Sequence, residues 1–183
     1  MADVILVTGG SRSGKSDYAL KAAESLPGPR AFVATCPPLD DEMADRIEKH
    51  RQKRARSNWL TIEEPLDLAG ALRSHQEIKL FLVDCLTLWI NNLLHQAHQN
   101  GTSLSEEETA GRCAEVLEIC RQRSGTVIFV TNEVGWGIVP ATPLSRTYRD
   151  LVGRCNQVVA EAARQVTLVV CGFPMNLKER RLL

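Results

Sequence analysis

The chain has 183 residues, 44% apolar and 24% charged, a composition typical of one folded domain with a single core. Basic and acidic side chains number 22 each, and a net charge of zero argues against a nucleic-acid partner. No apolar run approaches the roughly 20 residues of a membrane span. None of the six cysteines forms a C-x-x-C pair, which favours buried thiols in a reducing cytoplasm over a disulfide or a cysteine metal site. We therefore expect one cytoplasmic domain, residues 1–183.

The first predicted elements are a strand over residues 4–7 and a helix over residues 17–25, joined by a glycine-rich segment. That segment has the pattern G-x-x-x-x-G-K-[ST]. Its glycines let backbone N–H groups surround a phosphate chain, while the helix N-terminus and the lysine add positive charge. The serine hydroxyl is a ligand for Mg²⁺. The sequence therefore predicts a nucleoside triphosphate site, the phosphate loop, made of Gly9, Gly10, Ser11, Arg12, Ser13, Gly14, Lys15 and Ser16.

A second acidic position follows the apolar run Leu80–Val83. Asp84 stands where the second acid of a phosphate-loop NTPase usually lies, at the carboxyl end of a buried strand. A strand-end cap is the alternative interpretation, but together with Lys15 the position favours a role beside Mg²⁺.

The rest of the chain alternates between the two kinds of secondary structure. The apolar stripe from Leu86 to Leu94 fits either core or a subunit contact. The remaining predicted elements are strands over 31–35, 59–62, 126–131 and 166–171, helices opening at 40–42 and at 86, helices over 66–74, 105–123 and 144–164, a loop over 96–102, and a frayed tail after about residue 173.

This alternation predicts an α/β fold in three layers, with a mostly parallel central sheet covered by helices on both faces. Ligands of such sheets bind beyond the carboxyl ends of the strands. Five segments end there: the phosphate loop, Thr35–Cys36, Glu63, Asp84 and Asn132–Glu133. We therefore expect one active site at that edge.

His50 lies in a strongly basic stretch with Arg46, Lys49, Arg51, Lys53, Arg54 and Arg56. One interpretation is a solvated basic helix face with an incidental histidine. The other is a phosphate-holding patch whose imidazole attacks a phosphate. Nearby cations disfavour the imidazolium and lower the histidine pKa below its reference of about 6.5, which would leave a neutral nucleophile.

Four segments together resemble the bifunctional adenosylcobinamide kinase/adenosylcobinamide-phosphate guanylyltransferase family. They are the phosphate loop, Asp41-Glu42-Met43 leading to His50, residues 84–87 and, most specifically, residues 131–140. The resemblance extends to about Gly172 and implies a P-loop NTPase (RecA-like) fold. It also implies a homotrimer.

The resemblance implies two reactions. Adenosylcobinamide first takes the γ-phosphoryl group of ATP or GTP. GTP then donates GMP to a histidine with loss of pyrophosphate, and adenosylcobinamide phosphate accepts the GMP, giving adenosylcobinamide-GDP. By motif position His50 would carry the GMP, and Ser16 and Asp84 would hold the Mg²⁺. The implied nucleotide pocket adds Ala34, Thr35, Cys36, Arg51, Gln52, Lys53, Arg54 and Glu63 to the phosphate loop and Asp84.

Two alternatives remain open at this point. In a plain small-molecule kinase, His50 would only neutralise phosphate charge; a nucleotide-gated binding module would bind GTP without turnover. Glu133 fits equally well a role toward the substrate hydroxyl, as an orienting group or a base, and a role in stabilising its loop.

Overall fold

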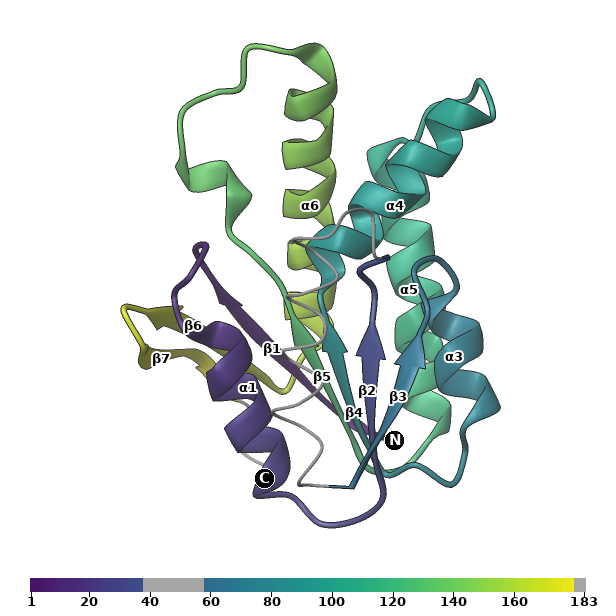
Figure 1. Cartoon of the computed structure of the whole chain (residues 1–183), viewed down its shortest axis with the longest axis vertical. Helices are drawn as coiled ribbons and strands as arrows, with labels where there is room; N and C mark the ends of the chain where they lie inside the picture. Colours follow the sequence, from purple (N-terminus) through teal and green to yellow (C-terminus); the bar gives the residue numbers. More distant parts are fainter. Residues whose placement is uncertain (38–57, 180–183) are drawn as a thin grey trace.

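The structure is a computed structural model, and it describes residues 1–37 and 58–179. Within these residues seven strands form one sheet in the order β3-β2-β4-β5-β1-β6-β7 (Figure 1). All neighbouring strands are parallel except β6 and β7. The strands are β1 (Asp3–Gly9), β2 (Arg30–Ala34), β3 (Trp59–Glu63), β4 (Leu80–Asp84), β5 (Thr126–Val130), β6 (Gln165–Val170) and β7 (Phe173–Glu179).

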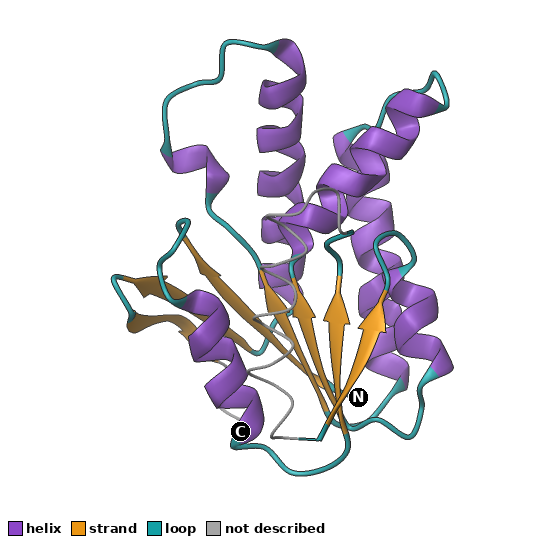
Figure 2. Ribbon diagram, viewed as in Figure 1, coloured by secondary structure: helices purple, strands orange, loops and turns teal. Residues whose placement is uncertain are grey.

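Helices lie on both faces of this sheet (Figure 2). Helix α1 packs on one face, and the four helices that come later in the chain, α3, α4, α5 and α6, share a second core on the opposite face. Alternation within β4 shows the two sides: Leu80 and Leu82 join the core beneath α1, whereas Phe81 and Val83 join the other. The three-layer α/β prediction is confirmed. The helices are α1 (Lys15–Glu24), α3 (Leu68–Ser74), α4 (Leu86–Gln99), α5 (Glu106–Gln122) and α6 (Pro143–Ala162), with a 3₁₀ turn η1 (Val134–Trp136).

Helix starts follow local sequence signals. The Ser105 hydroxyl accepts the Glu108 N–H, and the Glu108 carboxylate accepts the Ser105 N–H, which forms a capping box at the start of α5. The Thr142 side chain caps α6, which opens with Pro143. The apolar stripe of α4, from Leu86 to Leu94, is buried within this chain and is therefore core.

Two predictions about element ends are wrong. Helix α4 continues to Gln99, through part of the segment expected to be a loop, and ends where Gly101 adopts a φ of 68°. The tail is not frayed between residues 173 and 179, because it forms β7, antiparallel to β6. A two-residue turn reverses the chain there: Cys171 and Gly172 have φ values of 52° and 83°, the positive values that a type I′ hairpin requires.

Arg123 connects several elements near the amino ends of the strands. Its guanidinium donates hydrogen bonds to the carbonyl oxygens of Leu72, His75 and Ile78, and it stacks 4.3 Å from the centroid of the Phe81 ring. These contacts join the end of α5 to α3 and to the segment that enters β4.

In the described part of the chain, no helix has the length and apolarity needed to cross a membrane. All six cysteines lie in this part and are free thiols.

Candidate functional site

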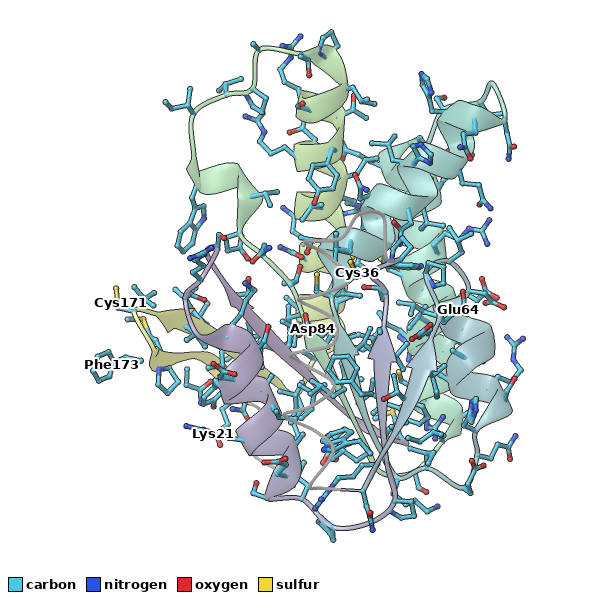
Figure 3. The ribbon with its side chains drawn as sticks, viewed as in Figure 1. Lys21, Cys36, Glu64, Asp84, Cys171 and Phe173 are labelled. Atoms are coloured by element: carbon cyan, nitrogen blue, oxygen red, sulfur yellow. The ribbon has the colours of Figure 1, made fainter. Side chains whose placement is uncertain are left out.

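The register of the parallel strands brings their carboxyl ends to one edge of the sheet. Ala34 is aligned with both Glu63 and Asp84, and Asp84 is aligned with Val130. Val130 is in turn aligned with Val7, two residues before the phosphate loop. Figure 3 shows Asp84 at this edge. The five predicted segments therefore end at the same edge of the sheet.

The phosphate loop needs glycine at two positions. A Cβ on Gly9 would lie 2.4 Å from the Val169 carbonyl oxygen and 2.7 Å from the Ser13 hydroxyl oxygen, which no side chain tolerates. Gly14 has a φ of 91°, and a Cβ there would lie 3.2 Å from the Gly172 Cα. Gly172, in the turn between β6 and β7, donates its N–H to the Ser13 carbonyl oxygen at 2.8 Å. The β6–β7 hairpin thus packs against the loop that the sequence pattern predicts to hold phosphates.

Polar groups inside the loop fit an anion. The Ser13 hydroxyl oxygen is buried and, within the described residues, has no hydrogen-bond partner. Lys15 is buried, and its ammonium group donates to the Gly10 carbonyl oxygen at 3.2 Å. Ser11 and Arg12 are exposed at the rim. A phosphate chain would give the buried groups charged partners, because a loop at a helix N-terminus directs N–H groups and partial positive charge inward.

The groups predicted to hold Mg²⁺ belong to adjoining parts of this edge. Ser16 and Asp84 are both half-buried. Burial, and next the negative charge of the Asp84 carboxylate, raise the pKa of the neighbouring Cys85 thiol to about 11. The positive charge of the Lys15 ammonium group acts against this rise. Asp84 and Lys15 therefore act on the same thiol.

A hydroxyl and a carboxylate are the hard oxygen donors that Mg²⁺ accepts, and this ion usually completes its shell with water and substrate phosphates. Residues 1–37 and 58–179 contain no group of three or more histidine, cysteine, aspartate or glutamate side chains placed to hold a metal. The hydroxyl of Ser16 and the carboxylate of Asp84 are donors that fit Mg²⁺, and Mg²⁺ at this position stays a prediction.

Thr35 has a structural role. Its hydroxyl donates to the Cys85 carbonyl oxygen at 2.8 Å and accepts the Cys85 N–H at 2.7 Å. The Asn92 amide donates to the carbonyl oxygens of Thr35 and Pro65, at 2.8 and 3.1 Å. The ends of β2 and β4 are thereby held together, and the Thr35 side chain is fully buried. Nucleotide binding by Thr35 stays a prediction.

The neighbouring predicted nucleotide contacts differ in exposure. Ala34 is buried, Cys36 is half-buried, and Glu63 is exposed at the end of β3. Glu64 instead accepts the N–H groups of the two residues before α3, Leu66 and Asp67.

A polar network that the sequence did not reveal lies between β1, β5 and α6. One Glu133 carboxylate oxygen accepts hydrogen bonds from the Thr8 hydroxyl, at 2.6 Å, and from the Asn156 amide, at 3.3 Å. Asn156 also accepts from the Thr131 hydroxyl at 2.7 Å and donates to the Asn132 carbonyl oxygen at 3.0 Å. The one available signal was Asn156 itself, a polar residue on the buried stripe of α6.

The predicted nucleophile and its basic neighbours, His50, Arg51, Gln52, Lys53 and Arg54, lie outside the described residues, as does the helix expected to open at residues 40–42.

Comparison with known proteins decides the family. The family of cobinamide kinase / cobinamide phosphate guanyltransferase matches residues 5–177. The chain belongs to this family. It is 42% identical over 179 residues to the bifunctional adenosylcobalamin biosynthesis protein CobP of Pseudomonas aeruginosa, covering 97% of this chain and 98% of that protein. It is 38% identical to the bifunctional adenosylcobalamin biosynthesis protein CobU of Escherichia coli and of Salmonella typhimurium, in each case covering 96% of this chain and 99% of the relative.

Proposed function

We propose that this protein phosphorylates adenosylcobinamide and then transfers GMP from GTP to the product, giving adenosylcobinamide-GDP in cobalamin biosynthesis. The observation that carries the proposal is the family match over residues 5–177. The phosphate-loop geometry supports it, because the Ser13 hydroxyl and Lys15 are buried polar groups at the start of α1 that suit a triphosphate.

In the first reaction, the phosphate loop binds ATP or GTP, and the hydroxyl of adenosylcobinamide attacks the γ-phosphorus. Lys15 would hold the outer phosphates, and the N–H groups of the loop would fix their orientation. Ser16 and Asp84 would hold Mg²⁺, which supplies neutralisation of the phosphate charge when it is bound. Positioning and charge neutralisation account for most of the catalysis of phosphoryl transfer, and these are the functions that a loop of this kind provides.

In the second reaction, His50 is the proposed nucleophile. Its ring nitrogen forms a bond to the α-phosphorus of GTP, the bond from that phosphorus to the bridging oxygen breaks, and pyrophosphate leaves. An oxygen of adenosylcobinamide phosphate then attacks the same phosphorus, and the N–P bond breaks to restore the histidine. The basic neighbours Arg51 and Arg54 would offset the phosphate charge.

The deciding experiment measures the intact mass of the protein after incubation with GTP and Mg²⁺. We expect the wild type to gain one GMP through an acid-labile bond and the His50→Ala variant to gain none. His75→Ala is the matched control and should behave as wild type, because this histidine lies at the carboxyl end of α3, where its ring nitrogen Nδ1 is hydrogen-bonded to the Ala71 carbonyl oxygen. Absence of the adduct in a wild type that binds GTP would favour the plain kinase.

The resemblance also leads us to propose a cytoplasmic homotrimer with no nucleic-acid partner. Six free thiols support a reducing compartment. The apolar side chains of Phe173, Met175 and Leu177 support an oligomer, because they are exposed on the edge strand β7 in the single chain. Light scattering should return three times the 20.3 kDa mass of one chain, and a single-chain mass would contradict the trimer.

A further inference from the structure

The two proposed reactions make different demands on proton transfer. The first uses a neutral hydroxyl as the nucleophile, so a proton must leave that oxygen as its bond to phosphorus forms. The second uses an imidazole nitrogen and then a phosphate oxygen that is already ionised, and neither needs an added base. A base that serves only the first reaction would therefore separate the two activities. This inference rests on the proposed function.

Glu133 is placed for such a role. It follows β5, the strand that lies between β1 and β4, and its N–H donates to the Gly9 carbonyl oxygen at 3.3 Å. Its carboxylate contacts Thr8, at the end of the strand that leads into the phosphate loop, and the strand it follows is paired on its other side with β4, which ends in Asp84. The side chain is half-buried, so it combines a fixed position with access to the edge of the sheet.

The carboxylate of Glu133 is held through only one of its oxygens. The Thr8 hydroxyl and the Asn156 amide both donate to Oε1, at 2.6 and 3.3 Å. Asn156 is itself fixed by its bonds to Thr131 and Asn132. Within the described residues, no hydrogen bond to Oε2 is recorded, so this oxygen keeps its capacity to accept.

A structural role alone does not explain a carboxylate at this position. Both partners of Oε1 are donors, so the amide oxygen of glutamine would satisfy them equally well. The network fixes the side chain, and it makes no use of the second oxygen or of the negative charge. What glutamate adds is a second carboxylate oxygen, held in a fixed orientation, that can accept a proton.

The other carboxylates at this edge have different surroundings. Asp84 is the predicted Mg²⁺ ligand, Glu63 is exposed on the edge strand β3, and Glu64 accepts two backbone N–H groups. Of these described carboxylates, Glu133 alone follows a strand directly paired with β1.

We propose that Glu133 is the catalytic base of the kinase reaction. As the substrate oxygen bonds to the γ-phosphorus, its proton passes to Oε2 of Glu133. The bond between the γ-phosphorus and the bridging oxygen breaks, and the nucleoside diphosphate leaves with that electron pair. Thr8 and Asn156 are positioning residues, because they orient the carboxylate without contacting the reacting atoms.

The test compares Glu133→Gln with the wild type in both reactions. We expect kcat for phosphorylation of adenosylcobinamide by ATP to fall by about 10²–10⁴-fold, the usual contribution of a positioned base. Transfer of GMP from GTP to adenosylcobinamide phosphate, and the GMP adduct on the protein, should stay within about threefold of wild type, since glutamine preserves the bonds to Oε1. Glu64→Gln is the matched control, also a carboxylate accepting two hydrogen bonds at this edge, and should retain both activities.

A second variant covers the case in which Glu133→Gln alters the fold. Thr8→Val removes one bond to Oε1 and leaves the carboxylate in place, so phosphorylation should fall by about 10-fold with GMP transfer retained. A loss of less than threefold in phosphorylation by Glu133→Gln, or equal losses in both reactions by both variants, would overturn the inference. A wild type that forms the GMP adduct but does not phosphorylate adenosylcobinamide would instead refute the kinase half of the proposed function, and the base with it.

Discussion

Replacing Arg123 by methionine should destabilise the fold, because one guanidinium serves three backbone carbonyl groups. The hydrogen bonds to His75 and Ile78 are 3.1 and 2.7 Å long, and a third goes to Leu72. A hydrogen bond to a charged group contributes about 1.5–3 kcal/mol. Arg123 is half-buried, so water can replace part of what is lost, and we expect the total to fall below the sum for three such bonds, at about 3 kcal/mol. Methionine keeps an apolar chain against Phe81.

For a chain of this length, about 3 kcal/mol corresponds to a fall in Tm of about 6–12 °C. Thermal unfolding followed by circular dichroism at pH 7 measures it, and urea unfolding gives the free energy with its m-value. Arg121→Met is the matched control on the same helix. Arg121 is exposed and pairs with Glu118 at 3.0 Å, so its loss should move Tm by no more than about 2 °C.

The reasoning about Arg123 is refuted if the two arginine variants unfold at the same temperature. The GMP adduct provides an independent check, because Arg123 lies at the amino end of the sheet, opposite the phosphate loop. At a temperature where the Arg123→Met variant is folded, the adduct should form as in the wild type.

Three further predictions concern single groups. Gly9→Ala should abolish GTP binding by calorimetry, because its Cβ would meet a carbonyl oxygen at 2.4 Å; wild-type affinity would contradict the required close approach. Hydrogen bonds from Ser105 lower the pKa of the Glu108 carboxyl group below its usual 4.5, so the stabilisation from these bonds is complete above pH 4.5 and is lost as pH falls through the lowered pKa. The difference in unfolding free energy between the wild type and Glu108→Gln, measured in urea, should therefore narrow from pH 7 to pH 3. A constant difference would contradict this prediction. Iodoacetamide at pH 8 should label exposed Cys171 well before buried Cys120, whose pKa burial raises to about 12, as peptide mass mapping will show; equal labelling would disprove this difference.

Local patterns were enough to predict most of the fold. Short apolar runs such as residues 80–84 form strands because both of their faces are buried, and the capping box at Ser105 marks the start of α5. The tail was misjudged because Pro174 reads as a terminator. Proline is tolerated in β7, since this is an edge strand whose outer N–H groups need no partner in the sheet.

The candidate site was predictable where one continuous motif defines it, as in the phosphate loop. The position of Asp84 was also predictable, because the carboxyl ends of parallel strands share an edge. The environment of Glu133 was not. Its partners Thr8 and Asn156 are 125 and 23 residues away, and they meet it only because β5 pairs with β1 and α6 packs beside both. No local pattern contains that pairing.

The central position of β1 has a consequence for synthesis of the protein on the ribosome. Residues 3–9 are made first, yet their two neighbours in the sheet are β5 and β6, which end at residues 130 and 170. At about 5–20 residues per second, the strand that leads into the phosphate loop waits roughly ten to thirty seconds for its second partner. Nascent chains that end before residue 170 leave the apolar strand β1 without its partner β6, so they are candidates for chaperone binding. Nucleotide binding should therefore appear only late in synthesis.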